Sequence, residues 1–131
     1  MANQTSQPAQ NAERSPHCVA LYANTVGFEN SFWDLRLLLG QLDQSSGSAR
    51  NVVHATLNVP WAQAKLMAYF VQANVLLYES DHGPIELRRD TLPPDPTSLV
   101  NLSELPPNVR KTIEKLKAQY DAFMAGVKVV G

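Results

Sequence analysis

The chain has 131 residues, of which 44% are hydrophobic and 18% are charged. This composition is typical of one folded domain and excludes disorder throughout, and a formal net charge of −1 excludes nucleic-acid binding through excess positive charge. The single cysteine, Cys18, cannot form an internal disulfide. No apolar run reaches the ~18 residues of a membrane span, and the start of the chain lacks the pattern of a signal peptide. We therefore expect a cytoplasmic protein with no nucleic-acid or membrane partner.

Residues 1–16 contain no large apolar side chain after Met1, and we expect a disordered tail there. Residues 18–28 are rich in strand-forming residues. Their apolar positions change parity around Asn24 and Gly27, which predicts a first strand with a bulge at that point. Residues 29–31 then supply a turn.

Two further runs alternate with the period of a strand. In the second run the odd-numbered residues are apolar and are expected to face the core; they are Trp33, Leu35, Leu37 and Leu39. Residues 43–48 form a connector of turn-forming residues. The third run spans residues 51–59 and is expected to place on one face Val53, Ala55, Leu57 and Val59. Short connections make neighbouring strands antiparallel.

A long helix is predicted over residues 61–80. Pro60 directly precedes it and suits the first position of a helix. Polar residues fall into two narrow stripes, which leave two separate apolar faces. One face contains Leu66, Tyr69, Phe70, Ala73, Leu76 and Leu77, and the other contains Ala64, Met67, Ala68, Val71, Val75 and Tyr78. Such a helix needs a cover on both sides. Gly83 is expected to end it in the left-handed conformation, and Pro84 prevents continuation.

The remainder of the chain is predicted to consist of a Pro-rich linker at 91–107, an amphipathic helix at 108–126 and a short tail at 127–131. The apolar positions of that helix form a single seam made of Val109, Ile113, Leu116, Tyr120 and Phe123. The sequence thus predicts an α+β fold. Residues 17–90 form its core domain, an antiparallel three-stranded meander covered by the long helix, and the amphipathic C-terminal helix follows the linker.

Several short signatures resemble a small prokaryotic family recorded only as a domain of unknown function. They comprise Tyr22-Ala23-Asn24, Trp33-Asp34-Leu35-Arg36-Leu37, Gly40-Gln41, Ala64-Lys65, Tyr78-Glu79 and Gly83-Pro84-Ile85. The resemblance covers roughly residues 18–87, about half of the chain. Members of that family usually carry Ser or Thr where this chain has Val59, and the C-terminal helix lies outside the family pattern. The resemblance implies no activity.

No catalytic, cofactor-binding or metal-binding set is predicted. His17, His54 and His82 are the only histidines, and none has a further ligand at metal-binding spacing. Asp34 and Arg36 share a strand face, where opposite charges are common on a wet sheet. The aromatic residues Tyr22, Trp33, Tyr69 and Tyr78 are expected to serve core and interface packing rather than a ligand.

We expect a non-catalytic, homo-oligomeric protein-interaction module, with a homodimer as the simplest assembly. The expected oligomer interface is the second apolar helix face, through Met67, Val71, Val75 and Tyr78. The C-terminal helix either covers that face within the same chain or binds a protein partner. One alternative is a chaperone that binds unfolded clients, because the strand from Tyr22 to Glu29 resembles the first strand of SecB-type export chaperones. An enzyme with an unrecognised site is the other alternative.

Overall fold

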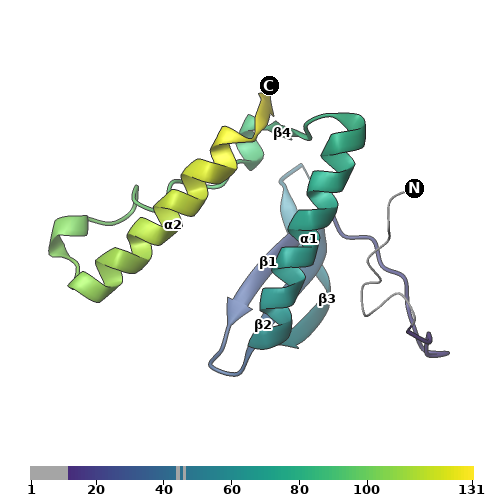
Figure 1. The fold of residues 1–131 in the computed structure, drawn as a ribbon. Coiled ribbons are helices and arrows are strands. Elements are labelled where there is room, and N and C mark those ends of the chain that lie inside the picture. Colours follow the sequence, from purple (N-terminus) through teal and green to yellow (C-terminus); the bar gives the residue numbers. More distant parts are fainter. Residues whose placement is uncertain (1–11, 44, 46) are drawn as a thin grey trace. The chain divides into compact units, whose positions relative to one another are not determined.

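The computed structural model describes residues 12–43, 45 and 47–131, and its elements follow the predicted order (Figure 1). Three strands, β1 (Thr25–Asn30), β2 (Asp34–Asp43) and β3 (Arg50–Pro60), form an antiparallel sheet. The long helix α1 (Trp61–His82) follows directly, and the second long helix is α2 (Pro107–Ala125). The predicted α+β fold is confirmed. The expected tail at 1–16 lies largely outside the described residues.

The chain divides into two compact units, and the boundary falls inside α1, between Leu66 and Met67. The first unit contains the three-stranded sheet and the first residues of α1. The second contains the rest of α1, a two-stranded sheet and α2. The sequence predicts a boundary at a different place, after residue 90, because the Pro-rich segment begins there and prolines are typical of linkers.

One face of the sheet is apolar, and the opposite face carries the polar and charged residues together with Leu38 and Leu42. Leu35, Leu37 and Leu39 of β2 pair with Val59, Leu57 and Ala55 of β3, and on the other side Leu37 pairs with Phe28 and Leu39 with Val26. Directly paired residues lie on the same face. These paired apolar residues therefore lie on one face, which we call the apolar sheet face. It consists of Val26, Phe28, Leu35, Leu37, Leu39, Ala55, Leu57 and Val59. The predicted alternation of β2 is confirmed from Leu35 onward, whereas Trp33 lies in the turn before the strand.

The irregularity of the sheet lies between β2 and β3, not at the predicted position in the first strand. The register shifts between Leu39 and Gly40, so that Val53 pairs with Gly40 and His54 is the extra residue. Val53 therefore leaves the apolar sheet face, contrary to the sequence expectation. A Cβ on Gly40 would collide with the backbone carbonyl of Val52, which explains the glycine at this position.

Helix α1 begins and ends close to the predicted residues. Pro60 is the last residue of β3 rather than the first of the helix. A proline is tolerated there because β3 is an edge strand of the sheet and Pro60 ends it. The indole Nε1 of Trp61 donates to the carbonyl oxygen of Ser31 at 3.0 Å and so ties the helix start to the β1–β2 turn. Past the last turn, Gly83 takes the predicted left-handed conformation with φ 85°.

The second unit is built around a parallel strand pair. The strand β4 (Glu86–Arg88) pairs with β5 (Lys128–Val130), which lies in the segment that was expected to be a tail. Two short 3-10 helices, η2 (Arg89–Thr91) and η3 (Leu102–Glu104), interrupt the Pro-rich segment. The guanidinium of Arg110 donates to the carbonyl oxygens of Leu102 and Leu105 at 3.0 and 3.1 Å. These bonds fasten the Pro-rich segment to α2.

Candidate functional site

Many large apolar side chains are exposed on the surface of the described residues. Ala64 is the only hydrophobic residue among them that is buried, and no polar or charged residue is buried. On the apolar sheet face Phe28 is 61% exposed and Leu57 48%. Soluble monomers rarely leave contiguous apolar patches of this kind uncovered. These exposed apolar surfaces are therefore candidate functional sites.

The predicted interface on α1 is also largely exposed. Val71, Val75 and Tyr78 are exposed, and Met67 is half-buried. Their spacing of four, four and three residues places them on one side of the helix. Tyr78 stacks on His82 with ring centroids 4.4 Å apart, which fixes the orientation of its ring. The role of these four residues in an oligomer stays a prediction.

A second exposed feature lies at the β1–β2 turn. Phe32 and Trp33 are 84% and 79% exposed, and their rings meet edge to face with centroids 4.8 Å apart. The turn itself is well ordered by hydrogen bonds, because the hydroxyl of Ser31 accepts from the backbone N–H groups of Trp33 and Asp34. Rigid, exposed aromatic residues of this type are frequent anchors in protein interfaces.

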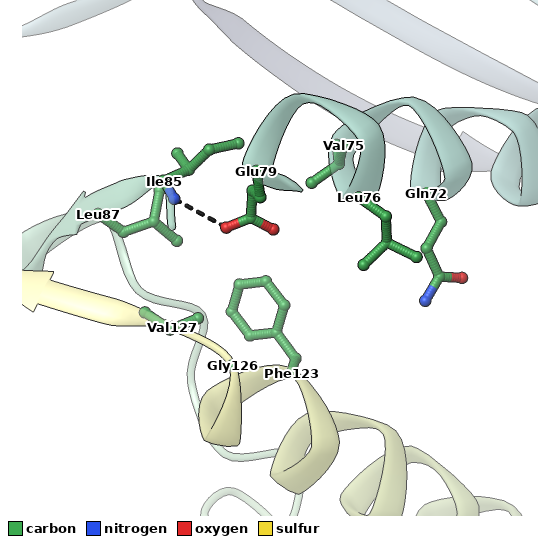
Figure 2. Close-up of a pocket in the computed structure, with 9 residues that line it drawn as sticks. All are labelled: Gln72, Val75, Leu76, Glu79, Ile85, Leu87, Phe123, Gly126 and Val127. Atoms are coloured by element: carbon green, nitrogen blue, oxygen red, sulfur yellow. Dashed lines mark hydrogen bonds between the residues drawn. The ribbon is translucent and has the colours of Figure 1, made fainter. Parts of the chain in front are cut away.

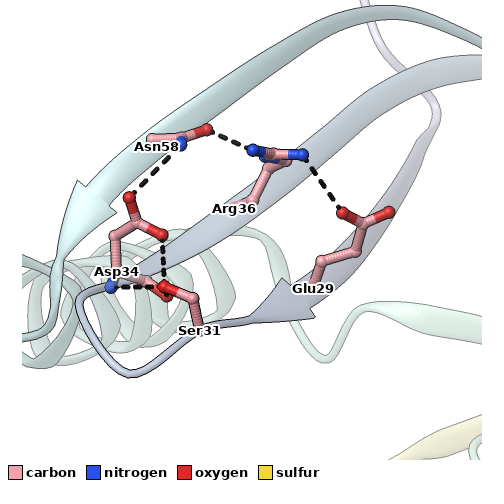
Figure 3. Close-up of polar contacts among 5 residues, drawn as sticks. All are labelled: Glu29, Ser31, Asp34, Arg36 and Asn58. Atoms are coloured by element: carbon pink, nitrogen blue, oxygen red, sulfur yellow. Dashed lines mark hydrogen bonds and ion pairs between the residues drawn. The ribbon is translucent and has the colours of Figure 1, made fainter.

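On the opposite, polar face of the sheet, the charged residues are linked to one another (Figure 3). The guanidinium of Arg36 donates to Asn58 Oδ1 at 3.1 Å and to Glu29 Oε2 at 3.4 Å. Asn58 in turn donates to Asp34 Oδ2 at 3.2 Å, and Ser31 Oγ donates to Asp34 Oδ1 at 2.8 Å. Both carboxylate oxygens of Asp34 thus have protein partners, and this network supports a structural role for Asp34 and Arg36.

Within the second unit, the end of α1, β4 and the end of α2 enclose a pocket of about 340 Å³ (Figure 2). Its walls are mainly apolar, and the residues that line it are Gln72, Val75, Leu76, Glu79, Ile85, Leu87, Phe123, Gly126 and Val127. Glu79 is the only charged residue of the lining and is half-buried. Its Oε2 accepts a hydrogen bond from the backbone N–H of Ile85, with 2.7 Å between the nitrogen and the oxygen. Val75 of the predicted interface belongs to this lining.

The seam of α2 borders a second hollow. Leu116, Tyr120 and Phe123 line it together with prolines of the Pro-rich segment, Pro93, Pro94 and Pro96. Asp95 holds this segment in place, because it accepts from Lys117 Nζ at 2.6 Å and from the backbone N–H of Thr97 at 2.8 Å. The hydrogen bond from Lys117 and those from Thr97 lower the pKa of Asp95 to about 2. Part of the seam thus faces residues of its own unit.

The histidines do not come together. His82 Nδ1 lies 3.0 Å from the carbonyl oxygen of Tyr78, His54 lies in β3, and His17 is an exposed residue before the sheet. Among residues 12–43, 45 and 47–131, no group of three or more His, Cys, Asp and Glu side chains is placed to hold a metal ion. Nor does any helix of this part combine the length and hydropathy that crossing a bilayer requires.

Sequence reasoning missed the pocket and its Glu79. Glu79 belonged to a polar stripe of the predicted helix, and Phe123 to a seam 44 residues later in the chain, so neither pattern linked the two. The available signal was a carboxylate near the end of a helix with two apolar faces, followed within a few residues by Ile85. Comparisons with protein-family models, with curated proteins and with solved structures find no match.

Proposed function

We propose that the protein is a non-catalytic, homo-oligomeric protein-interaction module whose copies form, by association, the hydrophobic core that one copy lacks. One observation carries the proposal: Ala64 is the only buried hydrophobic residue in the described part, and large apolar side chains are exposed on strands and helices alike. Burial of apolar surface is the main favourable term in folding and association. With 44% hydrophobic residues, the chain buries its exposed apolar surface most directly by pairing with identical copies.

The face of α1 with Met67, Val71, Val75 and Tyr78 is the interface that we favour. It is continuous along several turns, and its exposed members include a valine at 57% and a tyrosine at 54% exposure. Two copies related by a twofold axis bury the same patch on both subunits, so a single apolar surface suffices for a closed dimer. Obligate dimers of this kind often have no stable folded monomer.

Sedimentation of the full-length protein over a range of concentrations tests the proposal. We expect a dimer or a larger closed assembly, and Val71→Glu should shift the protein toward smaller species because it places a charge in the apolar interface. Gln63→Glu is the matched control, because it adds the same charge to a polar position of the same helix. A folded, monomeric wild-type chain at all concentrations would contradict the proposal.

A second candidate is a chaperone that holds unfolded clients, as in SecB-type proteins. The apolar sheet face supports it, because an exposed sheet with two free edge strands, β1 and β3, offers both apolar contact and backbone hydrogen bonds to an extended segment. Suppression of the aggregation of an unfolding reporter protein distinguishes the two candidates. A chaperone suppresses it at a near-stoichiometric ratio, whereas a pure oligomerisation module has no effect.

A further inference from the structure

The pocket between the end of α1 and the end of α2 has an electrostatic character that the apolar surfaces lack. Glu79 is its only charged residue, and no basic side chain belongs to its lining. Among the described residues only the backbone N–H of Ile85 hydrogen-bonds to the Glu79 carboxylate, through Oε2, and the carboxamide of Gln72 has no partner. With respect to the described residues, the pocket thus presents one carboxylate oxygen, Oε1 of Glu79, without a hydrogen-bond partner at a mainly apolar wall.

The arrangement of these groups favours a cation. Figure 2 shows the ring of Phe123 directed from α2 toward the Glu79 carboxylate, with the apolar side chains of Leu76 and Ile85 on either side. A cation at this place is attracted by the carboxylate, because the lining of the pocket contains no basic residue that would already neutralise it. The volume of about 340 Å³ lies at the small end of ligand pockets, which suits one side chain.

We propose that this pocket binds the side chain of a lysine presented by a protein partner. The apolar walls match the four-carbon stem of lysine, and Glu79 Oε1 is available to its ammonium group. Arginine fits less well, because a guanidinium prefers a bidentate contact, in which Oε2 of Glu79 would have to accept from the guanidinium and from the Ile85 N–H at once. The inference rests on the proposed function, since it assigns the partner chemistry of an interaction module.

Titration of the full-length protein with blocked amino acids, followed by NMR shifts of Phe123 and Val127, tests the inference. The probes are N-acetyl-lysine-N-methylamide, the norleucine analogue, which keeps the stem and lacks the charge, and the arginine analogue. The lysine probe can form a partly exposed ion pair with Glu79, and the norleucine probe cannot. We therefore expect the lysine probe to bind about fivefold more tightly than the norleucine probe. It should also bind more tightly than the arginine probe.

The variant Glu79→Gln removes the charge and keeps an acceptor for the Ile85 N–H, so we expect it to abolish the preference for lysine over norleucine. Glu114→Gln removes an exposed carboxylate from α2 outside the pocket and should leave the preference unchanged. Equal binding of lysine and norleucine, tighter binding of arginine, or no shift with any probe would overturn the inference. Sedimentation of the same samples reports the oligomeric state independently, so the proposed function can hold where this inference fails.

Discussion

The carboxylate of Asp95 accepts a hydrogen bond at 2.6 Å from the ammonium of Lys117, which lies 22 residues later in the chain. Lys117 also pairs with Asp121 one helical turn further along α2, at 3.1 Å. The pKa of Asp95 is lowered to about 2, chiefly by the bond from Lys117, and Asp95 in turn raises the pKa of Lys117. This ionic contact therefore adds to the hydrogen bonds of Arg110 that link the Pro-rich segment to the second helix.

This contact predicts a defined pH dependence. Because the folded-state pKa of Asp95 lies below its ordinary value of 3.8, its stabilising effect is complete above about pH 4 and is lost as the pH falls toward 2. Asp95→Asn should lower the melting temperature at neutral pH, and its difference from the wild type should shrink between pH 4 and pH 2. Thermal melts across this range measure the effect. A difference that stays constant with pH would show that the charge contributes nothing.

Any side chain in place of Gly40 should destabilise the sheet. A Cβ at this position meets the Val52 carbonyl group, which is backbone and cannot move without disrupting β3. We expect Gly40→Ala to destabilise the protein by about 1–3 kcal/mol, measured by urea denaturation. Gly27→Ala is the control within the same sheet, because its Cβ meets only the Leu38 side chain at 3.5 Å, an ordinary contact distance. Equal effects of the two substitutions would rule out the close approach at Gly40.

The two faces of β2 should respond differently to substitution. Leu37→Asp places a charge on the apolar sheet face and should prevent folding or assembly, because an unpaired charge there has no compensating partner. Arg36→Ala removes contacts to Glu29 and Asn58 from the exposed polar face and should cost less than about 1 kcal/mol. Circular dichroism melts of both variants measure the effects. Similar melting temperatures for both variants and the wild type would mean that the assigned strand register is wrong.

The tie between the helix start and the β1–β2 turn depends on the indole N–H of Trp61. Trp61→Phe keeps an aromatic ring and removes the 3.0 Å bond to Ser31, and we expect a loss of about 1 kcal/mol in the free energy of unfolding. Trp33→Phe is the matched control, because the Trp33 side chain is highly exposed and its indole N–H makes no hydrogen bond to the described residues. Denaturant titration compares the two. A larger loss for Trp33→Phe would refute this role of Trp61.

The elements with a regular local pattern could be predicted from the sequence, and the contacts between distant segments could not. The alternation from Leu35 to Leu39 is a local property, and the structure confirms it. The displacement of Val53 arises from the extra residue His54 in β3. The alternation pattern does not reveal it, because positions 52 and 53 are both valine and either could face the core. The sequence predicts a tail where the strand at Val129 lies, because the pairing of Val129 with Leu87 depends on a segment about 40 residues earlier.

That parallel pairing of β4 with β5 has a consequence for the order of folding. The meander joins neighbouring strands through short connections, so its first contacts close small loops at a low entropic cost. The pairing of Leu87 with Val129 brings together segments separated by the whole Pro-rich segment and α2. Chain topology of this kind slows the formation of contacts. We therefore expect amide protons of the meander to gain protection from hydrogen exchange before those of β4 and β5, in a refolding experiment followed by pulse labelling.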